Sequence, residues 1–193
     1  TVLINYNNTQ MEFARNASLL LFSGLLISCA VSSSNVEFLQ SRCAATRYPS
    51  LCYDSLVGYM SQFGTNDVAL SKTALIISRN AATQMLKVIK TVSKEKPSSK
   101  QLDGIYDTCS SVADNALYQL KQSIKAIKKV KGDEFKLSSI KTWVSAALTD
   151  ATTCTDEIQD GEQAKAAEKI YNIATRLSML TSNALALTNT MKQ

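Results

Sequence analysis

Four long segments of the chain place apolar residues at steps of three or four positions, and this spacing constrains the fold more than any other feature. The segments cover about residues 66–93, 101–130, 137–158 and 162–191. Such steps put the apolar residues on one face of an α-helix, so each segment predicts an amphipathic helix. In chain order the four apolar stripes are Leu70, Ala74, Ile77, Ala81, Met85, Val88 and Val92; Ile105, Cys109, Val112, Ala116, Leu120, Ile124 and Ile127; Ile140, Val144, Ala147, Ala151, Cys154 and Ile158; and Ala166, Ile170, Ile173, Leu177, Leu180, Ala184, Leu187 and Met191.

Short links connect these predicted helices, with breaks around Pro97 and Gly132. Four amphipathic helices with short links favour an antiparallel up-down bundle. Two shorter helices, over about residues 36–46 and 50–62, are predicted ahead of it, because Pro49 disfavours a helix at the residue before it and suits a helix start. Alanines in the stripes let helix axes approach closely and leave little room for a cofactor cavity. The predicted fold class is therefore an all-α four-helix bundle with an N-terminal helical hairpin and no cofactor.

The beginning of the chain predicts export. Residues 11–32 have the pattern of a secretory signal peptide, with a start at Met11, a basic Arg15, a short apolar run and small residues at the cleavage site. The run is too short and interrupted for a comfortable membrane span, so a retained anchor is the alternative and the mature form is predicted to be free of the membrane. Residues 1–10 are interpreted as a leader foreign to the native protein, and residues 33–193 as the mature domain.

Cysteine usage supports an extracellular chain. Cys29 leaves with the predicted signal peptide, and Cys43, Cys52, Cys109 and Cys154 remain, an even number that favours disulfides in an exported chain. Three pairings are possible. Cys43 and Cys52 are nine positions apart around the predicted hairpin turn, which favours a local bridge and leaves Cys109 with Cys154. The last two lie on predicted apolar stripes, so their bridge would join the second and third long helices from inside.

Several function classes are excluded or disfavoured by composition. The chain has no histidine, which removes the most common general base near neutral pH, the Ser-His and Cys-His nucleophile pairs and His-based zinc sites. No C-x-x-C spacing indicates a metal site, and the carboxylates lie on predicted loops and exposed faces. The sequence therefore predicts neither an enzyme nor a metal protein.

The formal net charge is +5, which is mild for a nucleic-acid-binding domain, and no nucleic-acid partner is predicted. The densest basic run covers residues 121–131. We interpret it as a solvated helix face, and attraction to an acidic polymer or protein surface is the alternative.

Four short elements occur in order along the chain. They are Cys43-Ala-Ala-Thr-Arg-Tyr-Pro-Ser-Leu-Cys52; Tyr106-Asp107-Thr108-Cys109; Thr142-Trp143-Val144-Ser145-Ala146-Ala147-Leu148-Thr149 followed by Thr153-Cys154-Thr155-Asp156; and Ser182-Asn183-Ala184-Leu185-Ala186-Leu187. Together, over about residues 36–190, they resemble the plant invertase and pectin methylesterase inhibitor domain family. The resemblance implies a four-helix bundle preceded by a helical hairpin, with the first cysteine paired to the second and the third to the fourth.

The resemblance also implies a function. Family members occupy enzymes of the plant cell wall, apoplast or vacuole; one branch binds pectin methylesterases beside the substrate cleft, and the other binds acid invertases. The run 142–149 is more similar to the pectin methylesterase branch and to the inhibitor-like pro-regions of some of those enzymes. The Pro-Lys-Phe element common in the invertase branch is absent, and Glu134-Phe135-Lys136 resembles it only vaguely. We therefore predict a secreted pectin methylesterase inhibitor of the apoplast or cell wall, monomeric, with an invertase inhibitor, a pro-region or a carrier of small apolar ligands as alternatives.

Five residues are predicted to bind the partner on the strength of the resemblance. The family places a threonine just before the fourth cysteine and an acid two positions after it on the enzyme-facing surface, and here these are Thr153 and Asp156. Asp114 retains part of an acidic pair after the third cysteine, whereas Asn115 and Tyr118 stand where acids are common. The alternative for Thr153 is packing beside the disulfide, and for Asp156 a solvated helix charge.

Overall fold

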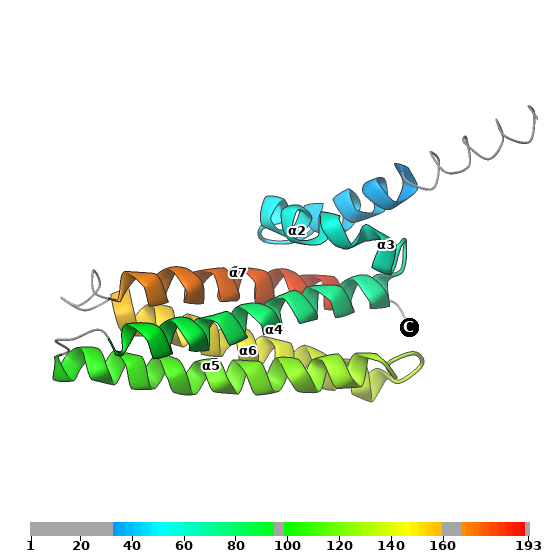
Figure 1. Ribbon diagram of the computed structural model, residues 1–193. Helices are drawn as coiled ribbons and strands as arrows, with labels where there is room; N and C mark the ends of the chain where they lie inside the picture. Colours follow the sequence, from blue (N-terminus) through cyan, green and yellow to red (C-terminus); the bar gives the residue numbers. More distant parts are fainter. Residues whose placement is uncertain (1–32, 95–98, 160–166, 192–193) are drawn as a thin grey trace, which may run out of the picture. The chain divides into compact units, whose positions relative to one another are not determined.

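The computed structural model describes residues 33–94, 99–159 and 167–191 (Figure 1). The chain divides into two compact units, Thr1–Phe38 and Leu39–Gln193.

In the first unit the described residues are 33–38, and they are helical. The predicted leader 1–10, the predicted signal peptide 11–32 and Cys29 lie outside the described residues and stay predictions. The second unit contains all the helices that carry labels in Figure 1.

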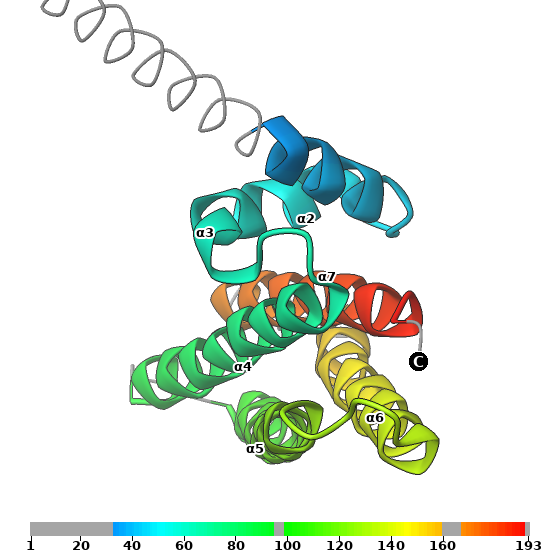
Figure 2. The same cartoon turned by 90° about the vertical axis from the view of Figure 1, so that its right-hand side faces the viewer.

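Four long helices form an antiparallel ring in the second unit. Each packs against its neighbours in sequence, and α7 closes the ring by packing against α4. Figure 1 shows the four helices running alongside one another, and Figure 2 shows α5 nearly end-on with α4 and α6 on either side. The predicted all-α bundle is therefore confirmed. The helices are α4 (Asp67–Val92), α5 (Lys100–Ile127), α6 (Glu134–Gln159) and α7 (Glu168–Asn189).

Capping side chains and one glycine define where these helices begin. Asn66 Oδ1 accepts a hydrogen bond from the Ala69 backbone N–H at 2.9 Å and caps the start of α4. Ser99 Oγ accepts from the Leu102 backbone N–H at 3.2 Å and does the same for α5. Gly132 has a φ of 73°, a left-handed conformation that glycine adopts without strain, in the turn from α5 into α6.

Two predicted helix boundaries are wrong, and a third falls outside the described residues. α5 ends at Ile127 and not at 130. α6 begins at Glu134 and not at 137. Asp133 Oδ1 accepts a hydrogen bond from the Lys136 backbone N–H at 2.8 Å and so caps a first turn of the helix. The prediction missed this turn because it contains no residue of the apolar stripe. α7 begins at Glu168, after the turn residue Ala167, and the predicted start at 162 lies outside the described residues.

The predicted second helix of the hairpin, 50–62, is broken into three short pieces. They are α2 (Pro49–Leu56), the 3₁₀ turn η1 (Val57–Tyr59) and α3 (Met60–Phe63). The break falls at Gly58, in the middle of η1, and glycine is a poor helix former. The preceding helical residues reach position 44, where 46 was predicted.

The bundle core follows the predicted stripes, apart from Ala166, which lies outside the described residues. Every stripe residue of α6 is buried. Five other stripe residues are half-buried, and a neighbour of each takes the buried position instead. At position 78, for example, the Ser78 hydroxyl is buried because it donates to the Ala74 carbonyl at 3.1 Å, which satisfies its polar group within the helix. The half-buried residues are Ile77, Val88, Val112, Ile124 and Ile173, and their buried neighbours are Ser78, Ile89, Ala113, Ser123 and Ala174.

Within the described residues there are two disulfides, with the predicted pairing. Cys43–Cys52 closes the hairpin turn, and Cys109–Cys154 joins α5 to α6. All four cysteines are buried.

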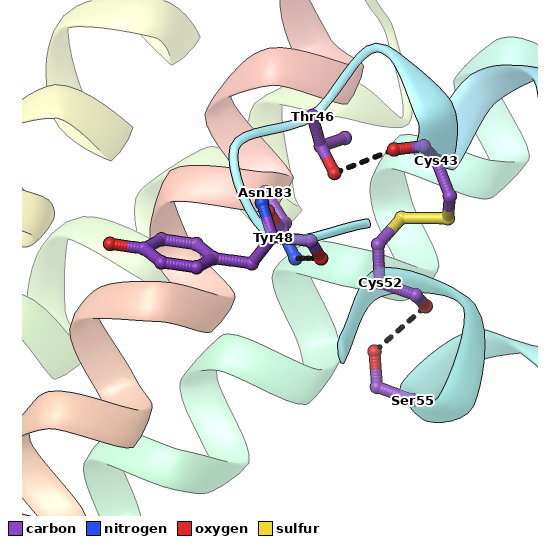
Figure 3. The surroundings of a disulfide bond; sticks show 6 residues. All are labelled: Cys43, Thr46, Tyr48, Cys52, Ser55 and Asn183. Atoms are coloured by element: carbon purple, nitrogen blue, oxygen red, sulfur yellow. Dashed lines mark hydrogen bonds between the residues drawn. A yellow bond between two sulfur atoms is a disulfide. The ribbon is translucent and has the colours of Figure 1, made fainter. Parts of the chain in front are cut away.

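A side chain of α7 holds the hairpin turn onto the bundle (Figure 3). Asn183 Oδ1 accepts from the Tyr48 backbone N–H at 3.1 Å, and Asn183 Nδ2 donates to the Tyr48 carbonyl at 2.9 Å. Tyr48 is the residue from which α2 starts. On the other side of the hairpin, the Arg42 guanidinium donates to both carboxylate oxygens of Asp67, at 2.6 and 3.0 Å, and Asp67 is the first residue of α4.

We expect Asn183→Ala to lower the free energy of unfolding by about 2 kcal/mol, because it removes both hydrogen bonds and leaves the Tyr48 N–H unpaired. The Tyr48 carbonyl would keep its bond from the Cys52 N–H, so the penalty falls on the N–H. Urea denaturation measures the loss. Asn172→Ala, at an exposed position of the same helix, is the matched control and should change stability by less than about 0.5 kcal/mol. Equal losses for the two variants would contradict the assigned role of Asn183.

Candidate partner-binding site

The predicted partner-binding residues lie on α5 and α6, the two helices that the Cys109–Cys154 disulfide joins. The Cα atoms of this pair are 4.8 Å apart, and both side chains are fully buried. The outer surfaces of α5 and α6 next to the bridge therefore belong to helices that are covalently held together.

Three exposed threonines form one uncharged face of α6, which we call the threonine face: Thr142, Thr149 and Thr153. Their positions differ by seven and four, so they lie on one side of the helix. Each hydroxyl donates to the backbone carbonyl four residues earlier, at 3.0–3.2 Å. These hydroxyl protons are already bonded within the helix, so covering the face with a partner leaves no unpaired donor.

The two α6 residues predicted to bind the partner share this face. Thr153 is exposed and directly precedes Cys154, so packing beside the disulfide does not bury it. Asp156 is also exposed and follows Thr153 by three positions, which places it one turn further along the same side. The threonine face therefore ends in a carboxylate.

The three α5 residues are all exposed, and one of them, Asp114, faces away from the α6 pair. Tyr118 has 63 % of its surface exposed, among the few large apolar side chains in the described ranges that are this accessible. Asn115 lies one turn before it on the same helix. Asp114 lines an open groove of about 420 Å³ between α4 and α5, together with Lys90, and thus faces away from α6.

Asp150 is a residue of this region that the sequence analysis missed. It lies four residues before Cys154 and three before Thr153, so it shares the side of α6 that the disulfide turns toward α5. The residue is half-buried, and its Oδ2 atom is shielded from solvent without a hydrogen-bond partner. Burial raises the pKa of the Asp150 carboxyl above its ordinary value. The sequence does contain a signal for this residue, since Asp150 lies one helical turn before Cys154, a cysteine of the predicted apolar stripe.

We expect Asp150→Asn to flatten the pH dependence of stability. Between the ordinary pKa of 3.8 and the raised pKa of Asp150, the folded state binds more protons than the unfolded state. Stability of the wild type should therefore fall as pH rises through this window and stay lower above it. Melting temperatures at several pH values between 3 and 7 measure the effect. The melting temperature of the variant should rise relative to that of the wild type only above the window. Parallel pH curves for the two proteins would contradict this role.

Within the described ranges, no group of three or more His, Cys, Asp or Glu side chains is placed to hold a metal ion. Of the helices that the structure describes, none combines the length and the apolar character needed to cross a bilayer. What the threonine face offers is an uncharged area for another macromolecule, on a helix that is covalently joined to α5.

Comparison with known proteins identifies the family. A family model described as "Plant invertase/pectin methylesterase inhibitor" matches residues 37–187. The chain belongs to this family. The match covers the hairpin turn, both disulfides and the threonine face, so it confirms the resemblance found in the sequence and the prediction that the chain is an inhibitor and not an enzyme.

Individual relatives agree with this assignment. The chain is similar to "Pectinesterase inhibitor 9" of Arabidopsis thaliana, at 35% identity over 167 residues, which are 81% of each protein. It is also similar to the "21 kDa protein" of Daucus carota, at 34% identity over 181 residues, 89% of this chain and 93% of that one. Among solved structures, a mutant form of a pectin methylesterase inhibitor from Arabidopsis has a similar fold, with a TM-score of 0.66 at 23% identity, over 78% of this chain and 95% of that one. The family match fits a secreted protein.

Proposed function

We propose that this chain inhibits a pectin methylesterase by docking the outer surface of α5 and α6 beside the substrate cleft of the enzyme. The observation that carries the proposal is the threonine face on a disulfide-joined helix pair, in a family whose members include relatives named as pectinesterase inhibitors. Inhibition would be steric: the docked bundle occupies the space that the polysaccharide needs.

Three properties of the surface favour binding to a protein. The disulfide between α5 and α6 restricts their relative motion before binding, which lowers the entropy lost on association. The threonine face presents methyl groups and bonded hydroxyls, so its desolvation costs little. Tyr118 offers an exposed aromatic ring, a side chain that commonly dominates binding energy at protein interfaces. Asp156 and Tyr118 are thus proposed to flank the contact, with Thr153 near its centre.

The location and assembly of the protein are part of the proposal. Removal of residues 11–32 during export would leave residues 33–193 in the apoplast or cell wall. The inhibitor is proposed to act there as a monomer against its enzyme target.

Acid invertase is the alternative target within the family, and the relatives named as pectinesterase inhibitors do not favour it. A carrier of small apolar ligands is disfavoured by the core, where Ala116, Ala147, Ala174 and Ala184 are fully buried and bring the helices close together.

A direct test measures methanol release from esterified pectin by a panel of plant pectin methylesterases, with and without residues 33–193, at mildly acidic pH. We expect dose-dependent loss of activity for at least one isoform. Sucrose hydrolysis by an acid invertase, measured in parallel, should be unaffected. Full esterase activity across the panel, or inhibition of the invertase alone, would overturn the proposal.

A further inference from the structure

The end of the bundle where α5 turns into α6 holds the net charge of the whole molecule. Between Lys121 and Lys141 there are seven lysines and two acids, Asp133 and Glu134, which gives this segment a charge of +5. The complete chain, with 21 basic and 16 acidic residues, also has a charge of +5. The remainder therefore carries fourteen residues of each sign and is balanced.

These lysines form an outward-facing surface, which we call the basic end. Lys121, Lys125 and Lys128 lie within about 60° of one another around the helix axis, given 100° per residue. The buried Leu120 and Ile127 lie about 110–130° from the middle of this group. The exposed lysines of the basic end are Lys121, Lys125, Lys128, Lys129 and Lys131.

The acids of this segment offset little of that charge. Asp133 pairs with the Lys136 ammonium, and this contact lowers the pKa of the Asp133 carboxyl, so the two groups neutralise each other. Glu134 is exposed and is the remaining acid. The five exposed lysines thus face solvent with a single opposing carboxylate in the same segment.

Helix-end electrostatics explain only part of the cluster. Cations stabilise the C-terminal turn of a helix, which accounts for Lys125 and Lys128. Lys131 lies just before α6, and cations near the N-terminus of a helix are unfavourable. Lys131 therefore adds positive charge to the basic end without stabilising α6. The turn that contains it is yellow-green in Figure 1.

An exposed aromatic ring accompanies the lysines. Phe135, in the first turn of α6, has 84 % of its surface exposed, although an apolar ring gains nothing from contact with water. An exposed ring in the same segment as the five lysines suits a ligand that combines anionic groups with apolar C–H faces, because the electron-rich face of the ring attracts C–H groups.

We propose that the basic end binds a polyanionic carbohydrate, namely the de-esterified galacturonate stretches of pectin. The choice of this polyanion rests on the proposed function. A pectin methylesterase converts a neutral methyl ester and water into a carboxylate, a proton and methanol, so its product is a sugar polymer with one negative charge per reacted unit. Lysines attract this product and not the uncharged ester. The inhibitor would thereby be concentrated where the enzyme has already acted.

The threonine face begins at Thr142, about 10 Å along α6 from Phe135, and its far part around Thr153 lies well away from the basic end. Phe135 and Thr153 lie 18 residues apart on the same helix, a distance of about 27 Å along its axis. A polymer held at the basic end therefore leaves the part of the proposed docking surface around Thr153 accessible.

Binding of the chain to immobilised polygalacturonate and to fully methylesterified pectin tests the proposal, at low and at physiological salt. We expect at least about 10-fold tighter binding to polygalacturonate, weakening as salt rises. The triple variant Lys125→Gln, Lys128→Gln, Lys129→Gln should lose at least about 10-fold in affinity, and Phe135→Ala a further few-fold.

The matched control is the triple variant Lys87→Gln, Lys90→Gln, Lys94→Gln, which removes the same charge from three exposed lysines near the end of α4. It should lose less than about 3-fold. Equal losses for the two triple variants, equal binding to the esterified polymer, or tighter binding to anionic lipid vesicles than to polygalacturonate would each overturn the proposal.

Esterase inhibition, measured on the same variants, separates this proposal from the proposed function. Lost polymer binding with unchanged inhibition supports a distinct site at the basic end. Failure of the wild-type chain to inhibit any esterase would count against the proposed function, while the comparison of the two triple variants would still decide whether the basic end binds the polymer.

Discussion

Replacing Cys109 and Cys154 together by alanine is expected to lower the free energy of unfolding by about 4 kcal/mol. The disulfide closes a loop across a sequence separation of 45 residues, and without it the unfolded chain gains the corresponding conformational freedom. Alanine is the appropriate replacement, because both cysteines are fully buried and a serine would bury an additional hydroxyl. In a domain of this size, the melting temperature should fall by roughly 8–16 °C.

The paired replacement of Cys43 and Cys52 by alanine is the control for this prediction. Its loop covers a separation of nine residues, so the same entropy model gives a smaller loss of about 2.5 kcal/mol. Guanidinium denaturation of the two double variants and the wild type orders the three stabilities. A smaller loss for the Cys109 and Cys154 pair than for the hairpin pair would contradict the loop-length argument.

The same variant bears on function. With the bridge removed, α5 and α6 would still pack side by side, but their relative motion would no longer be restricted covalently. We therefore expect weaker esterase inhibition even at temperatures where the variant is fully folded, because more freedom is lost on binding. Circular dichroism at the assay temperature shows whether the folded state is intact.

Thr153→Arg is expected to weaken inhibition of the esterase at least about 100-fold, or about 2.7 kcal/mol of binding free energy. Thr153 is exposed on the threonine face, so the arginine fits on the free protein and the fold should tolerate it. In the complex, a long charged side chain near the centre of a close contact would separate the two surfaces or be buried without a partner. Inhibition constants from methanol-release assays measure the loss.

Thr91→Arg provides the matched control for this substitution. Thr91 is also an exposed helical threonine, and its hydroxyl donates to the Lys87 carbonyl at 2.9 Å, four residues earlier, as in the threonine face. It lies on α4, away from the proposed contact, so the arginine there should change inhibition less than about 3-fold. Similar losses at the two positions would place the enzyme-binding surface elsewhere.

Comparison of individual residues shows where sequence reasoning succeeded. The close spacing of Cys43 and Cys52 left Cys109 to pair with Cys154, and the stripe positions of the last two agreed with the disulfide that the structure contains. The stripe of α6 was predicted without error because its apolar residues follow one narrow line along the helix. In α4, the spacing of apolar residues predicted a buried Ile77, whereas Ile77 is half-buried and Ser78 is buried, with its hydroxyl bonded within the helix.

Contacts between distant positions could not be derived in this way. The Asn183 side chain meets the Tyr48 backbone across 135 positions, and no local pattern relates the two residues. The shielded Asp150 oxygen likewise depends on the side chains that pack around α6, which periodicity alone does not specify. The exposure of Phe135 contradicts the preference of its residue type for burial and is visible only in the folded chain.

The amino-acid sequence by itself determined the number and order of the long helices, the faces that they bury and the pairs of cysteines available to join them. These properties depend on local spacing, because a helix repeats every 3.6 residues and apolar side chains leave water wherever that repeat aligns them. Tertiary structure alone decided how the hairpin is attached to α7, which of two neighbouring residues is buried, and which exposed side chains share one surface. Those outcomes depend on the packing of segments remote in sequence, where the hydrogen-bond partner and the shielding of each group come from another helix.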